Sequence, residues 1–295
     1  MDSIAQASEG NLVRRVGFAA VAIPLALAVV WYGGLPLAFL LALVAALGTN
    51  ELFGLAARQG IRPARTFALV SAAALAPVTY ATLVAADVRA LIEPSWPFLL
   101  AGWVIGLLTW TLAARAPGEK PLESASVTLL GVAYTSVFPA FLLVIRHGTF
   151  AERSWPAAWL VFFPLVVTWV CDTAAMFGGR LMAGPKLAPA ISPGKTRSGA
   201  AAGVIGGLLV APLFGAVVFP RVGVEAHLWQ LVVMAGVLSI IGQIGDLVES
   251  LLKRAAGVKD ASQLIPGHGG VLDRFDSLYF VIPVAAAMYR LFGII

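Results

Sequence analysis

The stretch LWQLVVMAGVLSIIGQIGDLVESLL, residues 228–252, decides the fold class of this chain. Its first 18 residues, 228–245, carry no charge, and about 20 apolar residues of helix are needed to cross a hydrocarbon core roughly 30 Å thick. The two acids of the stretch, Asp246 and Glu249, stand near its C-terminal end. The pattern therefore predicts a transmembrane helix that carries acidic residues close to one membrane surface.

Eight further apolar windows of this kind lie along the chain. They occur at about 16–33, 35–56, 66–85, 97–114, 127–145, 157–178, 199–219 and 271–292, and the first two can form a hairpin that turns at Gly33-Gly34. The composition agrees, because 60% of residues are hydrophobic and 12% charged, against about 45–50% and 25% in soluble domains. We predict an all-α polytopic integral membrane protein with about nine transmembrane helices.

The distribution of Lys and Arg predicts the orientation. If the N-terminus is cytoplasmic, fifteen of the 20 basic residues fall in cytoplasmic segments, at 14–15, 58–65, 115–120, 180–197 and 253–274. Short cytoplasmic loops carry such an excess, so we expect the N-terminus inside and the C-terminus outside. This asymmetry also explains most of the net charge of +5. Since no basic domain lies outside the membrane windows, no nucleic-acid partner is expected.

Neither an internal repeat nor an extended linker divides the sequence. We therefore expect one transmembrane domain over residues 1–295. Within it, the N-terminal helices of residues 1–150 are expected to supply a scaffold, lipid access and a surface for dimerisation. Residues 157–295 are expected to supply the catalytic helices and cytoplasmic loops.

Ionisable residues near the predicted membrane windows point to a functional site. Five acids lie near the cytoplasmic ends of windows in the C-terminal half: Asp172, Asp246, Glu249, Asp273 and Asp276. Burying such groups in a membrane costs several kcal/mol unless they are paired or functional. Four residues share one helical face at positions i, i+3, i+4 and i+7: Asp246, Glu249, Ser250 and Lys253. Asp273, Asp276 and Ser277 repeat this spacing at the start of the last window.

Two acidic helix faces joined by a basic loop suit the binding of a metal and phosphate. Carboxylates are the oxygen ligands that Mg²⁺ prefers, often together with substrate phosphates. The cations available for phosphate oxygens are Lys253, Arg254, Lys259 and Arg274. Gly269-Gly270 precedes a helix start, where backbone N–H groups can face an anion. The alternative is that these acids and bases only form interfacial salt bridges.

The segment KLAPAISPGKTRSG, residues 186–199, is expected to form a second half of the site, with Asp172 in the window before it. It is not a Walker A loop, because Pro189 stands where the first glycine belongs. Ser192, Lys195 and Thr196 can still donate hydrogen bonds to a polyphosphate. The alternative is a positively charged loop of turn residues. Glu51, in the second window, is expected either to line a polar cavity or to cap the interface.

Residues 250–276, SLLKRAAGVKDASQLIPGHGGVLDRFD, resemble the signature of phosphatidate cytidylyltransferases, also called CDP-diacylglycerol synthases. That signature runs S-x-L-K-R, four residues, K-D, a small residue, P-x-H-G-G and D-R-x-D. The matching positions are Ser250, Lys253, Arg254, Lys259, Asp260, Ser262, Pro266, His268, Gly269, Gly270, Asp273, Arg274 and Asp276. The family's upstream S-P-K-K-T-x-E-G departs here, because Gly194 replaces a lysine and Ser198 an acid.

The resemblance implies the reaction CTP + phosphatidate → CDP-diacylglycerol + pyrophosphate, at the cytoplasmic face of a bacterial inner membrane. It implies Mg²⁺ as cofactor, held by Asp246 and Asp273 with support from Asp276, and allows a second, monovalent cation such as K⁺. Lys253 and Arg274 would act in catalysis with these aspartates. The remaining residues assigned to substrate binding are Asp172, Ser192, Lys195, Thr196, Ser250, Arg254, Lys259, Asp260, His268, Gly269 and Gly270. The family resemblance also allows a homodimer.

Three other functions use similar residues. A CDP-alcohol phosphotransferase needs a D-G-x-x-A-R element that Asp273 and Asp276 do not provide. A CTP-dependent lipid kinase would release CDP in place of pyrophosphate, so product analysis separates it. A cation-coupled transporter would place its charges near the bilayer midplane, whereas these acids lie near one face.

Overall fold

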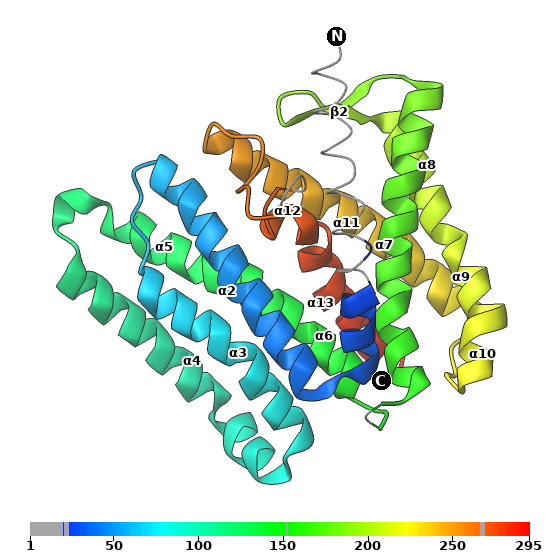
Figure 1. Cartoon of the computed structure of the whole chain (residues 1–295), viewed down its shortest axis with the longest axis horizontal. Coiled ribbons are helices and arrows are strands. Elements are labelled where there is room, and N and C mark those ends of the chain that lie inside the picture. Colours follow the sequence, from blue (N-terminus) through cyan, green and yellow to red (C-terminus); the bar gives the residue numbers. More distant parts are fainter. Residues whose placement is uncertain (1–19, 21–23, 152, 266–268) are drawn as a thin grey trace.

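The computed structural model describes residues 20, 24–151, 153–265 and 269–295, and most of them are helical (Figure 1). The uninterrupted long helices are α2 (Gly34–Arg58), α3 (Arg65–Val84), α4 (Ala86–Ala114), α7 (Trp155–Met182) and α11 (Leu228–Ala255). A short 3₁₀ turn, η1 (Pro117–Glu119), follows α4. The last helices are α12 (Leu272–Phe275) and α13 (Leu278–Leu291).

Two further helices are continuous but widen into a π-helical turn. The first comprises α5 (Pro121–Val132), η2 (Ala133–Val137) and α6 (Phe138–His147). The second comprises α8 (Arg197–Leu208), α9 (Val210–Leu213), η3 (Phe214–Val218) and α10 (Phe219–Val222). Pro139 and Pro220 are the second residues after the two π turns. Because proline lacks an N–H and its ring crowds the preceding turn, such local widening accommodates it within a helix.

Within the described residues, seven helices are long and apolar enough to cross a membrane, which confirms a polytopic membrane protein. They correspond to the second to eighth predicted windows. The first window, 16–33, lies partly outside the described residues, which show a helix over 24–32. The ninth window is divided between α12 and the 14-residue α13. The predicted total of nine, and the side of the membrane on which each terminus lies, stay predictions.

The tight turn predicted at Gly33-Gly34 is confirmed. Gly33 has φ 69° and Gly34 φ 59°, values that glycine adopts without steric cost. Arg146, fully buried in α6, donates from Nε to the Val30 carbonyl (2.9 Å) and from Nη2 to the Trp31 carbonyl (2.6 Å). These bonds satisfy two carbonyls at the C-terminal end of the helix over residues 24–32 and fix the position of that helix against α6.

The prediction of an all-α fold is wrong in one segment, between α7 and α8. There, β1 (Lys186–Ala188) and β2 (Ser192–Thr196) form an antiparallel hairpin in which Lys186 pairs with Thr196. Prolines at 185, 189 and 193 disfavour helix in this segment. The hairpin therefore replaces the simple loop that the sequence predicted, and it projects beyond the ends of α7 and α8 (Figure 1).

Glycines along α8 allow it to lie very close to α7. A Cβ on Gly199 would be 2.7 Å from the Ala175 carbonyl oxygen, and one on Gly203 would be 3.0 Å from the Cys171 carbonyl oxygen. Small residues at such positions let transmembrane helices approach through their backbones. This close crossing brings the N-terminal end of α8 and the attached hairpin to the cytoplasmic end predicted for α7.

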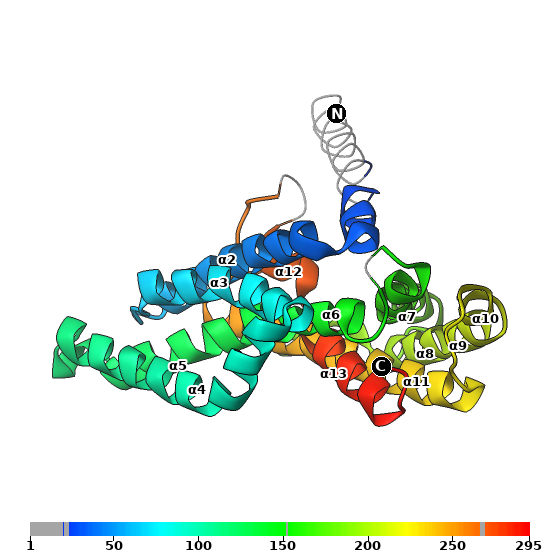
Figure 2. The same ribbon diagram turned by 90° about the horizontal axis from the view of Figure 1, so that it is seen from below.

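The bundle has two flanks joined by α13. Helices α3 and α4 lie on one side, α8 to α10 lie on the other, and α13 packs between α6 and α11 (Figures 1 and 2). Loops predicted on the same membrane side contact each other: Lys120 Nζ donates to the Gln59 carbonyl, and Arg254 Nε to the Ile191 carbonyl. The alternating order of the predicted windows is consistent with these contacts.

We expect Gly203→Leu to destabilise the protein by about 1–3 kcal/mol, because the added side chain must separate α7 from α8. Gly102→Leu on α4 is the matched control, since a Cβ there meets no described atom within 4 Å. Thermal unfolding in detergent measures both effects. Equal melting temperatures for the two variants would contradict the close α7–α8 crossing.

Candidate active site

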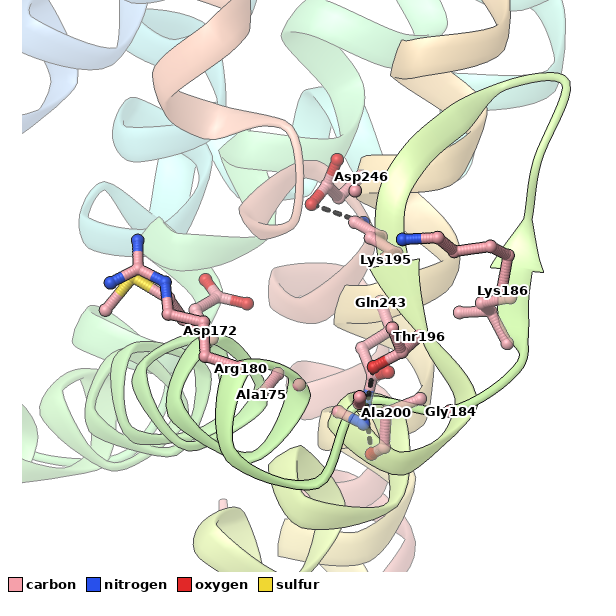
Figure 3. A pocket seen from close by; sticks show the side chains of 16 residues that line it. Asp172, Ala175, Arg180, Gly184, Lys186, Lys195, Thr196, Ala200, Gln243 and Asp246 are labelled. Carbon is pink, nitrogen blue, oxygen red and sulfur yellow. Dashed lines mark hydrogen bonds and ion pairs between the residues drawn. The ribbon is translucent and has the colours of Figure 1, made fainter.

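A cavity of about 610 Å³ opens between α7, the β1–β2 hairpin, α8 and α11. Its lining combines acidic and basic side chains: Asp172 and Asp246 with Arg180, Lys186 and Lys195 (Figure 3). The remaining lining residues are Ala175, Met176, Gly179, Ala183, Gly184, Leu187, Gly194, Thr196, Gly199, Ala200 and Gln243. Four predicted site residues, Asp172, Lys195, Thr196 and Asp246, thus surround one space.

Helix α7 supplies one wall of the cavity. Asp172, Met176 and Arg180 are spaced i, i+4 and i+8, so they share one helical face. Ala175 and Gly179 lie on the same face and leave room beside them. The cavity therefore has the Asp172 carboxylate on α7 and the Arg180 guanidinium two turns nearer the C-terminal end of the helix (Figure 3).

An ion pair between Lys195 and Asp246 joins the hairpin to α11. Lys195 Nζ lies 2.5 Å from Asp246 Oδ2, and both side chains are a little over a quarter exposed. Ser250 Oγ donates to Asp246 Oδ1 at 3.3 Å. Because Lys195 also interacts electrostatically with Asp172 and Asp276, it is a cation placed among three carboxylates.

Thr196 stabilises the helix that forms another wall of the cavity. Its Oγ1 accepts a hydrogen bond from the Gly199 N–H at 3.0 Å, the N-cap interaction that begins α8. Ser198, the position where the family pattern has an acid, donates to the Ala183 carbonyl at the end of α7. The turn from the hairpin into α8 is therefore held by two hydroxyl groups.

A second cluster of charges lies buried between α11 and α12. Lys253 Nζ is 2.6 Å from Asp273 Oδ1 and 3.2 Å from Glu249 Oε2. Asp273 Oδ2 accepts from the N–H groups of Ala261 (2.9 Å) and Gly270 (2.8 Å). Asp273 thus binds one lysine and two loop N–H groups, and among the described residues it lies outside the lining of the cavity.

The expectation that N–H groups near Gly269-Gly270 remain free for an anion is wrong for the residues described. Gly270 donates to Asp273, and the next two N–H groups, of Val271 and Leu272, donate to Glu51. The helix start does bind anions, but they are carboxylates of the protein itself. Gly269 has φ 82°, and its carbonyl accepts from the Ile265 N–H.

Asp276, at the turn between α12 and α13, interacts electrostatically with Asp246 and Asp172. Its Oδ1 accepts from the Ser277 N–H at 2.6 Å. Across the part of the chain that the structure describes, no three His, Cys, Asp or Glu side chains converge closely enough to form a complete metal site. The carboxylates are therefore near one another without being gathered around a single point.

Several predicted site residues lie away from the described cavity lining: Ser192, Arg254, Lys259, Asp260 and Arg274. Arg254 donates from Nε to the Ile191 carbonyl (3.1 Å) and from Nη1 to the Val258 carbonyl (2.9 Å), so it joins the hairpin tip to the next loop. Lys259, Asp260 and Arg274 are exposed. His268 lies outside the described residues, and its role stays a prediction.

Sequence reasoning did not assign Arg180, Lys186 or Gln243 to the site. The spacing of Asp172, Met176 and Arg180 on one face of α7 was a signal for Arg180. Gln243, one helical turn before Asp246, had a similar signal; its Nε2 donates to the Ala200 carbonyl at 3.2 Å. Lys186 enters the cavity only because the hairpin folds back, which no local pattern indicated.

We expect Lys253→Met to destabilise the protein by about 3–5 kcal/mol, since it leaves Glu249 and Asp273 buried without their cation. Adding Glu249→Gln should recover part of that loss. The exposed Lys120→Met, which loses only an exposed hydrogen bond to the Gln59 carbonyl, is the control and should change the free energy of unfolding by less than about 1 kcal/mol. Denaturation in mixed micelles measures all three. A free energy of unfolding equal to that of the wild type in Lys253→Met would contradict the buried pairing of Lys253 with Asp273 and Glu249.

The chain matches the model of the cytidylyltransferase family over residues 13–292. A phosphatidate cytidylyltransferase of Brucella suis is 42% identical over 194 residues, which cover 57% of this chain and 66% of that protein. A phosphatidate cytidylyltransferase of Staphylococcus saprophyticus is 37% identical over 178 residues, which cover 60% of this chain and 63% of that protein. The matched region thus spans slightly less than two thirds of these relatives. From the family match over nearly its whole length, the chain belongs to the cytidylyltransferase family.

Proposed function

We propose that this protein is a CTP:phosphatidate cytidylyltransferase, a nucleotidyltransferase of phospholipid synthesis. The observation that carries the proposal is the cavity whose lining combines Arg180, Lys186 and Lys195 with Asp172 and Asp246. Membership of the cytidylyltransferase family and the names of its relatives support it. We further propose that the protein lies in a bacterial inner membrane with this cavity facing the cytoplasm, where CTP is found.

The cavity suits a nucleoside triphosphate in size and charge. Its volume of about 610 Å³ is within the roughly 300–1,000 Å³ of typical ligand pockets. CTP and phosphatidate are both polyanions, so bringing them together requires compensating positive charge. Arg180, Lys186 and Lys195 supply three cations from two walls of the cavity. We assign them to the phosphates of CTP.

An apolar groove beside the cavity supports a lipid substrate. The groove, about 300 Å³, lies between α8 and α11, and its apolar lining includes Val204, Ile240 and Ile244. It shares Leu187, Ala200 and Gln243 with the polar cavity. A lipid whose acyl chain lies in the groove would therefore have its phosphate close to Lys195 and Asp246.

The carboxylates fit Mg²⁺ by their chemistry. Asp172, Asp246 and Asp276 interact electrostatically with one another, and Lys195 interacts with all three. Carboxylate oxygens are the donors that a hard divalent ion prefers. We propose that Asp246 and Asp276 hold Mg²⁺, assisted by Asp172. Asp273, predicted as a ligand, would first have to give up its bond to Lys253.

When bound, Mg²⁺ would neutralise charge on the α-phosphate and on the pyrophosphate leaving group. A phosphate oxygen of phosphatidate attacks the α-phosphorus of CTP, a P–O bond forms there, and the bond to the β-phosphate breaks. Because that oxygen is already anionic, the chain needs no nucleophile of its own. Arg180, Lys186 and Lys195 orient the phosphates and offset their repulsion, which is most of the catalytic task in such transfers.

We expect Asp246→Asn to lower kcat about 100- to 1,000-fold, because it removes charge that organises Lys195 and the metal. Arg180→Met should raise KM for CTP about tenfold through loss of one charge-assisted phosphate contact. Arg221→Met, an exposed change distant from the cavity, is the control for both. The assay uses purified protein in lipid micelles with CTP, phosphatidate and Mg²⁺, and measures CDP-diacylglycerol and pyrophosphate.

Equal amounts of the two products, lost on addition of EDTA, would support the proposal. Release of CDP without pyrophosphate would instead show a CTP-dependent lipid kinase. Wild-type kinetics in Arg180→Met would contradict the assignment of this cavity to CTP.

A further inference from the structure

Glu51 connects the N-terminal half of the chain to the loop before α12. It lies on α2 and is only 5% exposed. Its Oε1 accepts from Ser262 Oγ (2.7 Å) and from the Val271 N–H (3.0 Å), and its Oε2 accepts from the Leu272 N–H (2.7 Å). One carboxylate thus binds residues more than 200 positions away in the chain.

Glu51 and Asp273 together hold both limbs of this loop. Their carboxylates accept the three consecutive N–H groups of residues 270–272. On the other limb, Asp273 accepts from the Ala261 N–H and Glu51 from the Ser262 hydroxyl. Unsatisfied N–H groups at a helix start otherwise need water or a cap, so this pair of carboxylates fixes where α12 begins.

The glycine at 270 fits this arrangement. A Cβ on Gly270 would fall within 2.7 Å of Glu51 Oε1 and Cδ and still closer to Oε2. No real Cβ contact is that short, so any larger residue would push Glu51 away from the loop. Gly270, assigned to substrate binding from the sequence, is therefore explained by its contact with Glu51.

The position of α12 matters because acidic residues follow directly. Asp273 is one residue after Leu272 and binds Lys253 of α11, while Asp276 is three residues further and interacts electrostatically with Asp246. Helix α12 has only four residues, too few to hold its own orientation. Contacts from outside must place it, and α2 is an element that provides them.

We propose that Glu51 is a positioning residue for the transfer reaction: by holding the start of α12, it keeps Asp273 and Asp276 aligned with Lys253 and Asp246. This inference rests on the proposed cytidylyl transfer. Glu51 touches no described cavity-lining residue through the hydrogen bonds above, so it acts on the chemistry through α12. Small displacements of catalytic groups lower turnover without weakening binding made elsewhere.

Two variants separate this role from simple stability. Glu51→Gln keeps the side-chain shape but replaces one carboxylate oxygen with an NH₂ group. That group cannot accept the hydrogen bond that a loop donor, such as the Val271 or Leu272 N–H, gives to Glu51. Ser262→Ala removes the hydrogen bond to Glu51 and the one that Ser262 Oγ accepts from the Leu264 N–H, and leaves Glu51 and its two N–H contacts in place. Glu123→Gln on α5, which is exposed, is the matched control. Full-length protein is used throughout, and the melting temperature shows whether each variant is folded.

We expect Glu51→Gln to lower kcat roughly 10- to 100-fold with KM for CTP nearly unchanged, because the CTP side of the cavity belongs to α7 and the hairpin. The Mg²⁺ concentration for half-maximal activity should rise about tenfold as Asp276 is displaced. Ser262→Ala should change both in the same direction by a smaller factor. An unchanged kcat, or a rise in KM alone, would overturn the positioning role.

Hydrogen exchange on substrate-free protein supplies a second readout. The amides of Val271 and Leu272 should exchange about tenfold faster in Glu51→Gln than in wild type, and at the wild-type rate in Glu123→Gln. Unchanged exchange would overturn the inference even if activity fell. If wild-type protein performs no cytidylyl transfer, the proposed function fails, and the exchange rates still decide whether Glu51 holds α12.

Discussion

The rest of the site depends on the buried ion pair between Lys253 of α11 and Asp273 of α12. Charges away from water need a partner to be tolerated, and here one lysine serves Asp273 at 2.6 Å and Glu249 at 3.2 Å. The pair fixes the last helices against α11. Asp246, two turns before Lys253 on the same face, then meets Lys195 of the hairpin. Helix α11 thus carries two ion pairs two turns apart, one with the hairpin and one with α12.

The N-terminal helices contribute less charge but are not only a scaffold. Helix α2 is well buried and supplies Glu51 to the loop before α12. Helices α3 and α4 bury few of their residues, as expected for surfaces that face lipid or a second copy. The described residues that line the cavity all lie between positions 172 and 246, whereas Glu51 of α2 hydrogen-bonds to the loop before α12.

Hydrophobic windows predicted seven of the spanning helices, since length and apolarity alone decide that a helix crosses a bilayer. Helical spacing also predicted that Asp246 and Lys253 share a face. The pairing of Asp273 with Lys253 corresponds to the salt-bridge alternative that the sequence left open. The sequence could not predict the hairpin. Three prolines disfavour helix between α7 and α8, but no local pattern indicated that Lys186 and Lys195 return toward α7. Nor could the sequence show that Asp273 and Glu51 would use the N–H groups of residues 270–272, which requires contacts across 200 residues.

The most direct test of the account follows the phosphorus atoms of CTP. Wild-type protein is given phosphatidate, Mg²⁺ and CTP labelled either at the α- or at the γ-phosphate, and the lipid product is isolated. Cytidylyl transfer predicts that label from the α-position enters the lipid and label from the γ-position leaves as pyrophosphate. Label from the γ-position in the lipid, or none from either, would contradict it.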